Sequence, residues 1–571
     1  MQAVLLLSGA SAPEELDEQE WERFSDLRAR PLPLNEAAPR QLIDAGLLDE
    51  YRAAVLEDYR SRCGDVLSFE ELSLLDGFSR ELAGALRFFL TLGSNAPPGR
   101  LSPASRKSRH ELTLRTDVSL SRRDTPGKPV QAALTPSPGL KYRMDWGGRL
   151  QAGLGSSVAL PLSAQAAGLT LGKISWDFSA LHPYLCWNGR KWPGKVLIGD
   201  YHLRLSQGLC LWSGFSMSGL SAPSAFVRRP TGISPYAAFS RTPALRGAAA
   251  SFRYGGWEAT VAGNVSSLLQ TGTIDPDKDF VAAEISWGGK RGRFCLCGVT
   301  TGKVSLGGRG CWHGTDLFGE LCYDIRGKSW AATAGCAFPI VSRFKCSVSL
   351  RYYAPDFSSG NCGAVRAGTK CANEAGLALG IQGSGWTLTA DACLHPRSRD
   401  ASCRHTAQLK AVATGRWSPG RGWMLDVRAS LRLRNYGEKQ KYDLRGQASW
   451  QPPSVSWATL SAGASCCRCD AWGVLLWLEQ SVQLSSVSLY LQEGWHRAPQ
   501  WADRLYLWRR SAPGSFSVPA RYGEGWFLSF YLSWKPLRTL KLYLRAGWQD
   551  FTYQSVRHRS ADAALQLSWA F

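Results

Sequence analysis

The sequence has 571 residues, of which 58 are glycine, 24 are tryptophan and only 4 are methionine. That length is too great for one ordinary domain, although a large barrel reaches it as a single domain. The mean hydropathy is −0.19, and the absence of a stretch of about 18 apolar residues excludes a transmembrane helix. A membrane barrel is not excluded, because half of each barrel strand faces a wet lumen and lowers the average hydropathy.

The net charge of +21 is divided unevenly along the chain. Residues 1–95 contain 18 acidic and 9 basic side chains, a net charge of −9, which leaves a net charge of +30 on residues 96–571. Such asymmetry usually separates modules with different surroundings. A basic barrel suits anionic lipid head groups or an anionic solute in the lumen, and the alternative is ordinary solvated charge on strand ends and loops.

Residues 1–12 contain a short apolar run, Val4–Leu7, followed by an Ala-Ser-Ala segment typical of a signal-peptide cleavage site. The segment has no basic residue before the apolar run and is shorter than a complete export signal. We therefore predict the remnant of a signal peptide over residues 1–12, with the mature chain beginning near residue 13.

Residues 13–93 have the pattern of a small, acidic, all-α domain. We expect helices over 14–27, from Asn35 as an N-cap, over 51–62 and over about 80–90, and Ser68 with Glu71 forms a capping box for another. Two similar turns, 44–48 and 75–79, have their glycines 31 residues apart. This spacing indicates a duplicated helix–turn–helix unit.

The duplication resembles the tandem helix-hairpin-helix repeats of competence-type DNA-receptor proteins, whose first unit opens with Leu-Asn-x-Ala, as residues 34–37 do here. The resemblance implies a nucleic-acid site at the two hairpin turns, where backbone amides would hold DNA phosphates. Its residues would be Gly46, Leu48, Gly77, Ser79 and Arg80. Leu48 and Ser79 replace the family's second glycine, and the domain's negative charge repels a polyanion. A protein-interaction or structural module is therefore our leading interpretation, and nucleic-acid contact is the alternative.

After a Pro/Ser/Gly-rich linker over residues 94–107, the hydrophobic period changes from 3.6 to 2. Apolar and polar side chains alternate clearly over 423–434, 526–534, 540–549 and 561–571. We count roughly 20–24 such strand segments over residues 108–571. A soluble sandwich also alternates, so the pattern alone leaves two architectures open.

Three features favour a membrane barrel. Trp526 and Trp534 lie eight residues apart on one face, near both edges of an apolar band, as an aromatic girdle requires. Unpaired arginines on the opposite faces fit a watery lumen and not a sandwich core. The chain ends on Trp569 and Phe571, which look like the terminal assembly signal of outer-membrane barrels. The predicted fold is mostly β: a large antiparallel transmembrane β-barrel in the outer membrane, preceded by a periplasmic all-α domain.

Residues 199–215, 245–249 and 518–525 resemble signature segments of a family of uncharacterised Bacteroidota-type outer-membrane β-barrels with an N-terminal helix-hairpin-helix domain. The resemblance runs from about residue 32 to residue 571, with the parts in the same order. It implies the architecture given above and no established biochemical activity.

Charged residues on the polar faces of the strands are predicted to line the lumen. They are Asp200, His202, Arg204, Arg428, Arg432, Arg434 and Arg545. The alternative for His202 is a ligand or base role. Neither a nucleophile–base motif nor a phosphate-binding loop stands in a fitting context, so we predict no enzyme and no cofactor.

Sixteen cysteines are many for an exported protein. Cys362 with Cys371, and Cys393 with Cys403, flank short segments and are candidates for local disulfides in an oxidising compartment. The run Cys466-Cys467-x-Cys469 leaves open a disulfide cluster or a soft-metal site, and we expect no metal.

The sequence therefore predicts a non-enzymatic outer-membrane barrel with a periplasmic helix-hairpin-helix module, acting as an envelope assembly or docking component. The alternative is binding and uptake of DNA or another polyanion across the outer membrane. The expected partners are outer-membrane lipid and a periplasmic protein, with nucleic acid as the partner in the alternative.

Overall fold

The structure is a computed structural model of the 571-residue chain. It describes all residues except 17, 94–107, 127–130, 159–161, 166–167, 172–180, 190–193, 215–218, 240–243, 290–291, 342–343, 359, 400–404 and 436–438. The linker predicted over 94–107 lies outside the described residues. Among the helices within the described ranges, none is long and apolar enough to cross a membrane.

Helices dominate the first 90 residues. The described α-helices are α1 Gln2–Ser8, α2 Glu18–Ala29, α3 Pro39–Asp44, α4 Glu50–Cys63, α5 Phe69–Leu72, α6 Arg80–Leu86 and, much later, α7 Ser266–Thr271. The short strands β1 Leu32–Pro33 and β2 Leu90–Thr91 pair in parallel and join the two ends of this region. The predicted capping box is confirmed, because Ser68 and Glu71 exchange side-chain and backbone hydrogen bonds at the start of α5.

The prediction that Asn35 caps a helix is wrong. The helix begins at Pro39, and the Asn35 side chain is fully buried. Its amide group donates to the Val66 carbonyl at 3.0 Å and accepts from the Val66 amide at 2.9 Å. Asn35 thus ties together the two helix–turn–helix units, α3–α4 and α5–α6, by satisfying buried backbone groups.

The rest of the chain forms a closed antiparallel barrel, and among the described strands 24 make up its wall. In the order of the circuit they are β3 Ser108–Asp124, β4 Gln131–Trp146, β5 Leu150–Ser157, β8 Leu181–Asn188, β9 Lys195–Arg204, β11 Leu245–Tyr254, β12 Trp257–Asn264, β13 Phe280–Gly289, β14 Gly292–Val299, β15 Lys303–Trp312, β16 Thr315–Asp324, β17 Ser329–Val341, β18 Phe344–Tyr353, β19 Glu374–Gly383, β20 Trp386–His395, β21 Thr406–Gly420, β22 Trp423–Arg434, β23 Lys439–Trp450, β24 Ala458–Arg468, β25 Trp472–Gln483, β26 Val487–Ala498, β29 Gly523–Trp534, β30 Leu540–Tyr553 and β31 Val556–Ala570. Shorter strands lie beside the wall: β6 Leu162–Gln165, β7 Gly168–Leu171, β10 Gly232–Pro235, β27 Leu505–Tyr506 and β28 Ala520–Arg521.

The barrel closes where its last strand, β31, pairs with its first strand, β3. β31 pairs with β3 over fourteen residue pairs, from Glu111 opposite Ala570 to Asp124 opposite Arg557. Closure is completed by Phe571, whose backbone exchanges hydrogen bonds of 2.9 and 3.0 Å with the backbone of His110. Because every wall strand then has two partners, no edge is left to pair with another chain.

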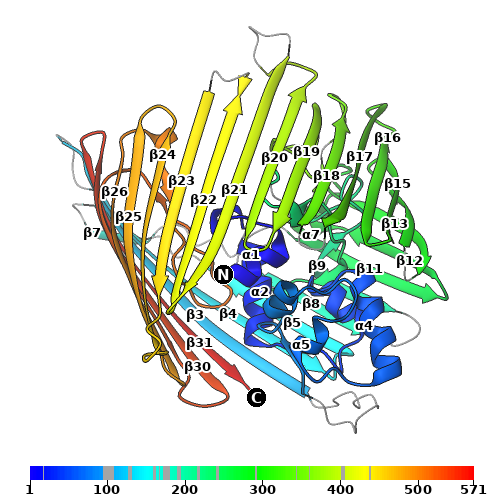
Figure 1. The fold of residues 1–571 in the computed structure, drawn as a ribbon, viewed down its shortest axis with the longest axis horizontal. Helices are drawn as coiled ribbons and strands as arrows, with labels where there is room; N and C mark the ends of the chain where they lie inside the picture. The colour runs from blue at the N-terminus through cyan, green and yellow to red at the C-terminus, as the bar shows by residue number, and fades with distance from the viewer. Residues whose placement is uncertain are drawn as a thin grey trace.

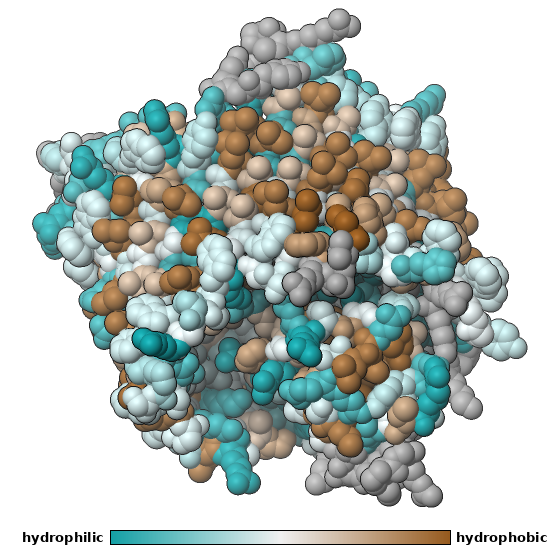
Figure 2. Space-filling view, viewed as in Figure 1, coloured by the Kyte–Doolittle hydropathy of each residue, from teal (hydrophilic) through white to brown (hydrophobic). Residues whose placement is uncertain are grey.

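The two faces of the wall differ in the way the alternation predicts. On β29, Trp526 and Leu528 are 62% and 41% exposed, whereas Ser529 between the outward positions is 6% exposed. Figure 2 shows the outward apolar side chains gathered over the strands in the upper part of the view. A closed barrel with an apolar outer face is an outer-membrane structure, because all its backbone groups are paired within the wall and lipid covers the outside.

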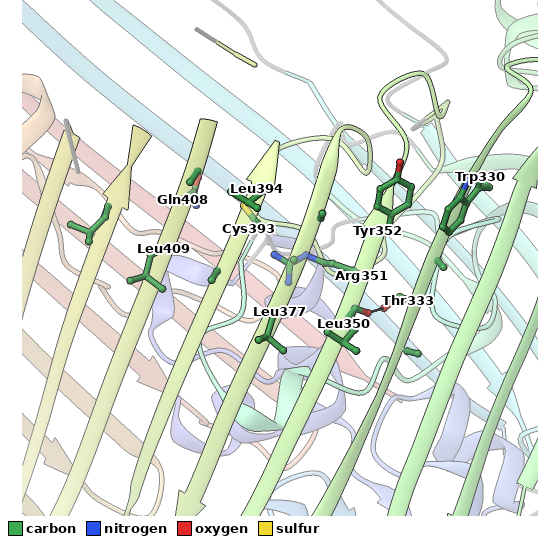
Figure 3. A pocket seen from close by; sticks show the side chains of 17 residues that line it. Trp330, Thr333, Leu350, Arg351, Tyr352, Leu377, Cys393, Leu394, Gln408 and Leu409 are labelled. Carbon is green, nitrogen blue, oxygen red and sulfur yellow. Dashed lines mark hydrogen bonds between the residues drawn. The ribbon is translucent and has the colours of Figure 1, made fainter. Parts of the chain in front are cut away.

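A close view of β17–β22 illustrates the same alternation (Figure 3). Leu350 and Tyr352 face outward, and the residue between them, Arg351, turns inward. The Arg351 guanidinium pairs with Glu374 at 2.5 Å and with Asp391 at 2.7 Å. The outward side chains line a shallow apolar groove of about 870 Å³ on the lipid-facing side.

The two ends of the barrel also differ. The end at which β3 begins and β31 ends has the short connections, such as 147–149, 255–256, 313–314 and 384–385, and we call it the short-turn end. The opposite, long-loop end has the connections 205–244, 354–373 and 499–522. We call the described part of 205–244 the inner loop, and 499–522 the second inner loop.

Candidate functional site

The lumen of the barrel is filled from both ends. Residues 1–93, here called the N-terminal domain, lie inside the curve of the wall, and Figure 1 shows their blue helices there with the N-terminus near the middle of the view. The Gln41 side chain reaches the Gly148 carbonyl, in a turn at the short-turn end, at 3.2 Å. The inner loop enters from the other end, and the two meet where Leu220, Ala225 and Phe226 join the hydrophobic core of the domain.

Acidic side chains of the domain pair with basic side chains of the wall. On one side of the circuit, Lys141 of β4 lies 2.6 Å from Glu22 and 3.1 Å from Asp26. Arg143, two residues along the same strand, lies 2.5 Å from Asp26. The Lys141 and Glu22 side chains are each only 5% exposed, so water screens this pair weakly.

Further pairs follow around the wall. Lys195 of β9 forms an ion pair with Asp44, and Arg309 of β15 lies 3.1 Å from Asp49. Asp49 is also the N-cap of α4. Burial favours the neutral carboxyl of Asp49, but Arg309 and Arg52 outweigh burial and hold its pKa well below the usual range. The domain is therefore bound to strands that are far apart in the circuit.

On the opposite side of the circuit, one carboxylate joins three parts of the chain. Glu15 lies 3.3 Å from Lys410 of β21 and 3.2 Å from Arg428 of β22, and it accepts a hydrogen bond from Ser221 of the inner loop at 2.5 Å. Burial alone would raise the pKa of Glu15, but Lys410 and Arg428 outweigh it and lower the pKa to about 2. Glu15 is therefore charged, and paired, at any ordinary pH.

Apolar contacts accompany these ion pairs. The Trp21 ring of α2 lies 5.7 Å from the rings of Trp508 and Phe516, both in the second inner loop. Near the chain start, Val4 and Leu7 are each 5% exposed and belong to the same core as the inner loop. The N-terminal segment predicted as a signal-peptide remnant is thus a packed helix, α1; its removal by a signal peptidase stays a prediction.

The inner loop is fastened to the wall by backbone hydrogen bonds. β10 pairs with wall strand β9 over four residues, and the Trp212 amide donates at 2.8 Å to the carbonyl of Asn361 in the neighbouring 354–373 connection. The Glu320 carboxylate, on β16, accepts from the amides of Gln207, Leu209 and Cys210 at 2.8, 3.0 and 3.1 Å. Three amides converging on one buried side chain anchor the loop to the wall.

The predicted lumen residues lie on inward faces, and most of them are not unpaired as the sequence suggested. Asp200 pairs with Arg246 and hydrogen-bonds His182 at 2.6 Å. His202 is buried, with its ring 4.6 Å from that of Tyr236 in the inner loop.

The predicted lumen arginines also have close neighbours. The Arg204 guanidinium lies over the Trp212 ring at 5.3 Å. Arg428 binds Glu15, and Arg545 lies 3.4 Å from Asp117. Arg432 is partly buried, and Arg434 is exposed at the long-loop end. The charges of Asp200, Arg428 and Arg545 therefore face partners within the chain.

The predicted nucleic-acid residues are not assembled into one surface. Gly46 has a φ of +70° in a buried turn beside the Arg23 side chain, and Leu48 in the same turn is 1% exposed. In the other turn, Gly77 and Ser79 are exposed, but the Ser79 hydroxyl caps α6 by accepting from the Leu82 amide. Only the second turn and Arg80 after it are therefore accessible in this arrangement.

The predicted disulfides are absent from the described residues: Cys362, Cys371 and Cys393 are free thiols, and Cys403 lies outside those residues. The Cys362 sulfur turns instead toward the Leu209 carbonyl at 2.8 Å, and the Cys371 sulfur toward the Ala364 carbonyl at 3.6 Å.

Cys466, Cys467 and Cys469 are also free. Their hairpin is closed by Asp503, whose carboxylate accepts from the amides of residues 469, 470 and 471. Within the described ranges, no cluster of His, Cys, Asp and Glu is arranged to hold a metal.

Sequence reasoning missed the residues that join the domain to the wall. They are Glu15, Glu22, Asp26, Asp44 and Asp49 on the domain, and Lys141, Arg143, Lys195, Arg309 and Lys410 on the wall. The available signal was the opposite sign of the two net charges, −9 and +30. The asymmetry predicts two separate surroundings, and it is instead the complementarity of one part for the other.

No family model matches the sequence, and no curated protein matches it. Among solved structures, the P pilus usher (PapC) translocation pore is similar over 81% of this chain and 99% of that one, at 10% identity and a TM-score of 0.43. Pseudomonas aeruginosa OccK11 (OpdR) is similar over 81% and 96% at 11% identity and a TM-score of 0.27. Pseudomonas aeruginosa OpdK with vanillate is similar over 82% and 100% at 9% identity and a TM-score of 0.28. At these identities and scores, the likeness carries no argument about function.

Proposed function

We propose that this chain is a plugged outer-membrane passage in which the acidic N-terminal domain is the removable part of the plug. The observation that supports the proposal is the set of ion pairs from the domain to β4, β9, β15, β21 and β22. A domain held by side-chain ion pairs and apolar contacts, with one covalent connection to the barrel, can leave as a unit. A domain held by shared strands could not.

Outer-membrane barrels have their short turns on the periplasmic side. By that rule the short-turn end, and with it the N-terminal domain, faces the periplasm. The domain also offers a surface for a partner there, because Leu67, Leu74 and Phe88 around the α5–α6 unit are 71%, 81% and 50% exposed. We therefore propose that a periplasmic protein docks on this unit, of helix-hairpin-helix type, and supplies the binding energy that opens the passage.

Passage of a polyanion is the second candidate, and the wall cations favour it. If the domain left, Lys141, Lys195 and Lys410 would lose their carboxylate partners and line an open, basic lumen. An anionic solute would then find the charges that the domain now occupies.

DNA binding by the domain's own hairpin turns has less support. The first turn is buried, and Asp76 and Glu81 flank the second. We expect the affinity of the full chain for duplex DNA at physiological salt to be about 10⁻⁴ M or poorer, the weak nonspecific range. Titration of labelled duplex at low and moderate salt measures it, and micromolar binding at moderate salt would promote DNA handling to the leading function.

The proposed function is tested by recording ionic current through planar lipid bilayers. The full chain should be closed for most of the recording, and a chain lacking residues 1–93 should conduct steadily. The deletion leaves all 24 described wall strands and the β3–β31 closure in place. If the shortened chain assembles into membranes and stays as closed as the full chain, the domain is not the gate.

A further inference from the structure

Two buried thiols from different parts of the lumen are in contact. Cys210 belongs to the inner loop and Cys297 to β14, 87 residues later, and their sulfur atoms are 3.3 Å apart. Each residue is 1% exposed. Both lie in a hydrophobic cluster made by the inner loop and the wall, which also contains Leu209 and Leu211.

Both sulfur atoms are held in place by their backbones. The Cys210 amide donates to the Glu320 carboxylate, and the neighbouring Leu209 carbonyl accepts from the Cys362 thiol. Cys297 stands in the middle of β14, opposite Glu284 on one side and Ser305 on the other. The two residues can separate only if the pairing of β14 with its neighbours or the hydrogen bond from the Cys210 amide to Glu320 is broken.

From this contact, in a protein of an oxidising compartment, we propose that Cys210 and Cys297 form a disulfide that fastens the inner loop to the barrel wall. A disulfide bond is about 2.05 Å long, so the two sulfurs need to approach by about 1.3 Å. The proposal is independent of the gating role of the N-terminal domain, because it concerns only the inner loop and β14.

The chemistry is a two-electron oxidation. Each thiol loses its proton and the pair gives up two electrons as the S–S bond forms. The electrons and protons reduce the disulfide of a thiol oxidoreductase to its dithiol, by exchange through a mixed disulfide. Since both sulfurs are inaccessible in the closed barrel, the exchange takes place before the inner loop is enclosed.

A third thiol makes the assignment specific. Cys322 of β16 is fully buried and belongs to the same hydrophobic cluster as Cys210 and Cys297. Cys322 is therefore the natural competitor for Cys210. The sulfur contact of 3.3 Å and the position of Cys297 opposite the anchored loop favour the Cys297 bond.

The test is a peptide map of the unmodified full chain purified from membranes. Free thiols are blocked with N-ethylmaleimide during lysis and again in denaturant, and the protein is digested with trypsin without reductant. The expected product is one species joining the peptide after Arg204 to the peptide after Arg293, lighter by two hydrogens than the sum of the two. Reduction should split it and expose Cys210 and Cys297 to a second, heavier label.

Controls make each outcome decisive. Cys63, which is exposed, should carry the first label throughout. No trypsin site separates Cys295 from Cys297, so the Cys295→Ser variant should leave the linked species intact. The proposal is overturned if Cys210 carries N-ethylmaleimide in the native chain, if Cys295→Ser removes the link, or if Cys210 is joined to Cys322 or Cys362.

Discussion

The N-terminal domain and the inner loop occupy the same lumen but are held by different forces. The inner loop is continuous with wall strands β9 and β11 at its two ends, and backbone hydrogen bonds fasten it. The domain is connected to the wall only through the chain before β3, and its carboxylates bind wall cations. Backbone pairing opens only when its hydrogen-bond ladder is broken, whereas a set of ion pairs can be exchanged for water or for another charged partner. In our proposal, the inner loop is therefore the fixed part of the lumen contents and the N-terminal domain is the releasable part.

The largest expected effect comes from removing three of the domain's carboxylates together. The variant Glu22→Gln, Asp26→Asn, Asp44→Asn leaves Lys141 and Lys195 buried without their carboxylate partners. Breaking one buried pair by removing one partner costs about 3–5 kcal/mol. We expect the fraction of time in the conducting state to rise at least about 100-fold in bilayer recordings, a shift of roughly 3 kcal/mol.

A matched control distinguishes the loss of ion pairs with the wall from a change in the net charge of the N-terminal domain. Glu57→Gln, Glu70→Gln and Glu81→Gln remove the same number of charges from exposed positions of the domain. This variant should conduct as rarely as the unmodified chain. Equal opening of the two variants would mean that net charge, and not docking, governs closure.

Acidification should release the domain through Glu15. Its pKa is lowered from an ordinary value of 4.5 to about 2, so its contribution is complete above about pH 4.5 and is lost as the pH falls toward 2. The shift corresponds to roughly 3 kcal/mol at neutral pH. We expect the contribution of Glu15 to be constant from pH 7 to about 5, and conduction to rise below that, in bilayer currents at constant salt.

The Glu15→Gln variant provides the control for that pH dependence. It should already conduct more often at pH 7, and its current should change less between pH 5 and 3 than that of the unmodified chain. Asp49 titrates in the same direction, so some dependence should remain. An unchanged pH profile would show that Glu15 does not hold the domain.

The inner loop should respond in another way. In Glu320→Gln, the three amides of 207, 209 and 210 share one carbonyl oxygen in place of two carboxyl oxygens, which costs about 0.5–1.5 kcal/mol for each hydrogen bond lost. We expect a lower midpoint of thermal unfolding in detergent and no increase in conduction, because the domain stays docked. Opening of the barrel by this variant would contradict the division into fixed and releasable parts.

The smallest effect concerns the fold of the domain itself. Gly46 has a φ of +70° in its turn, a conformation that costs an alanine about 1–2 kcal/mol. Gly84 lies inside α6 with open space where a Cβ would stand, so Gly84→Ala should stabilise by up to about 1 kcal/mol. Denaturant titration of the domain's helical signal should move in opposite directions for Gly46→Ala and Gly84→Ala.

Much of the wall was predictable from the sequence. The side chains of a barrel strand point alternately toward the lipid and toward the lumen, so apolar and polar residues alternate with a period of two. Trp526, Leu528 and Trp534 face outward as expected, and the strands over 423–434 and 540–549 exist as β22 and β30. The strand total of 24 falls at the upper end of the expected range. The strands and their outward-facing residues follow from the local hydrophobic pattern, so they can be predicted from the sequence.

The contents of the lumen were not predictable in the same way, because they depend on contacts between residues far apart. Asn35 has the sequence signature of a helix cap. Only the position of Val66 shows that the buried Asn35 side chain instead hydrogen-bonds the Val66 backbone and so joins the two helix–turn–helix units. Cys362 and Cys371 are close in sequence, yet the Cys362 sulfur contacts the inner loop at Leu209. The charges of the domain and the wall were visible, but no local rule indicates that they meet.

A charge swap between Asp44 and Lys195 tests the docking most directly, because the two side chains form an ion pair across the domain–wall boundary. In bilayer recordings, Asp44→Lys alone and Lys195→Asp alone should each increase conduction, since each places like charges together. The double variant restores an ion pair and should be nearly as closed as the unmodified chain. If the double variant conducts as much as the two single changes combined, the residues do not meet and the domain does not close this barrel.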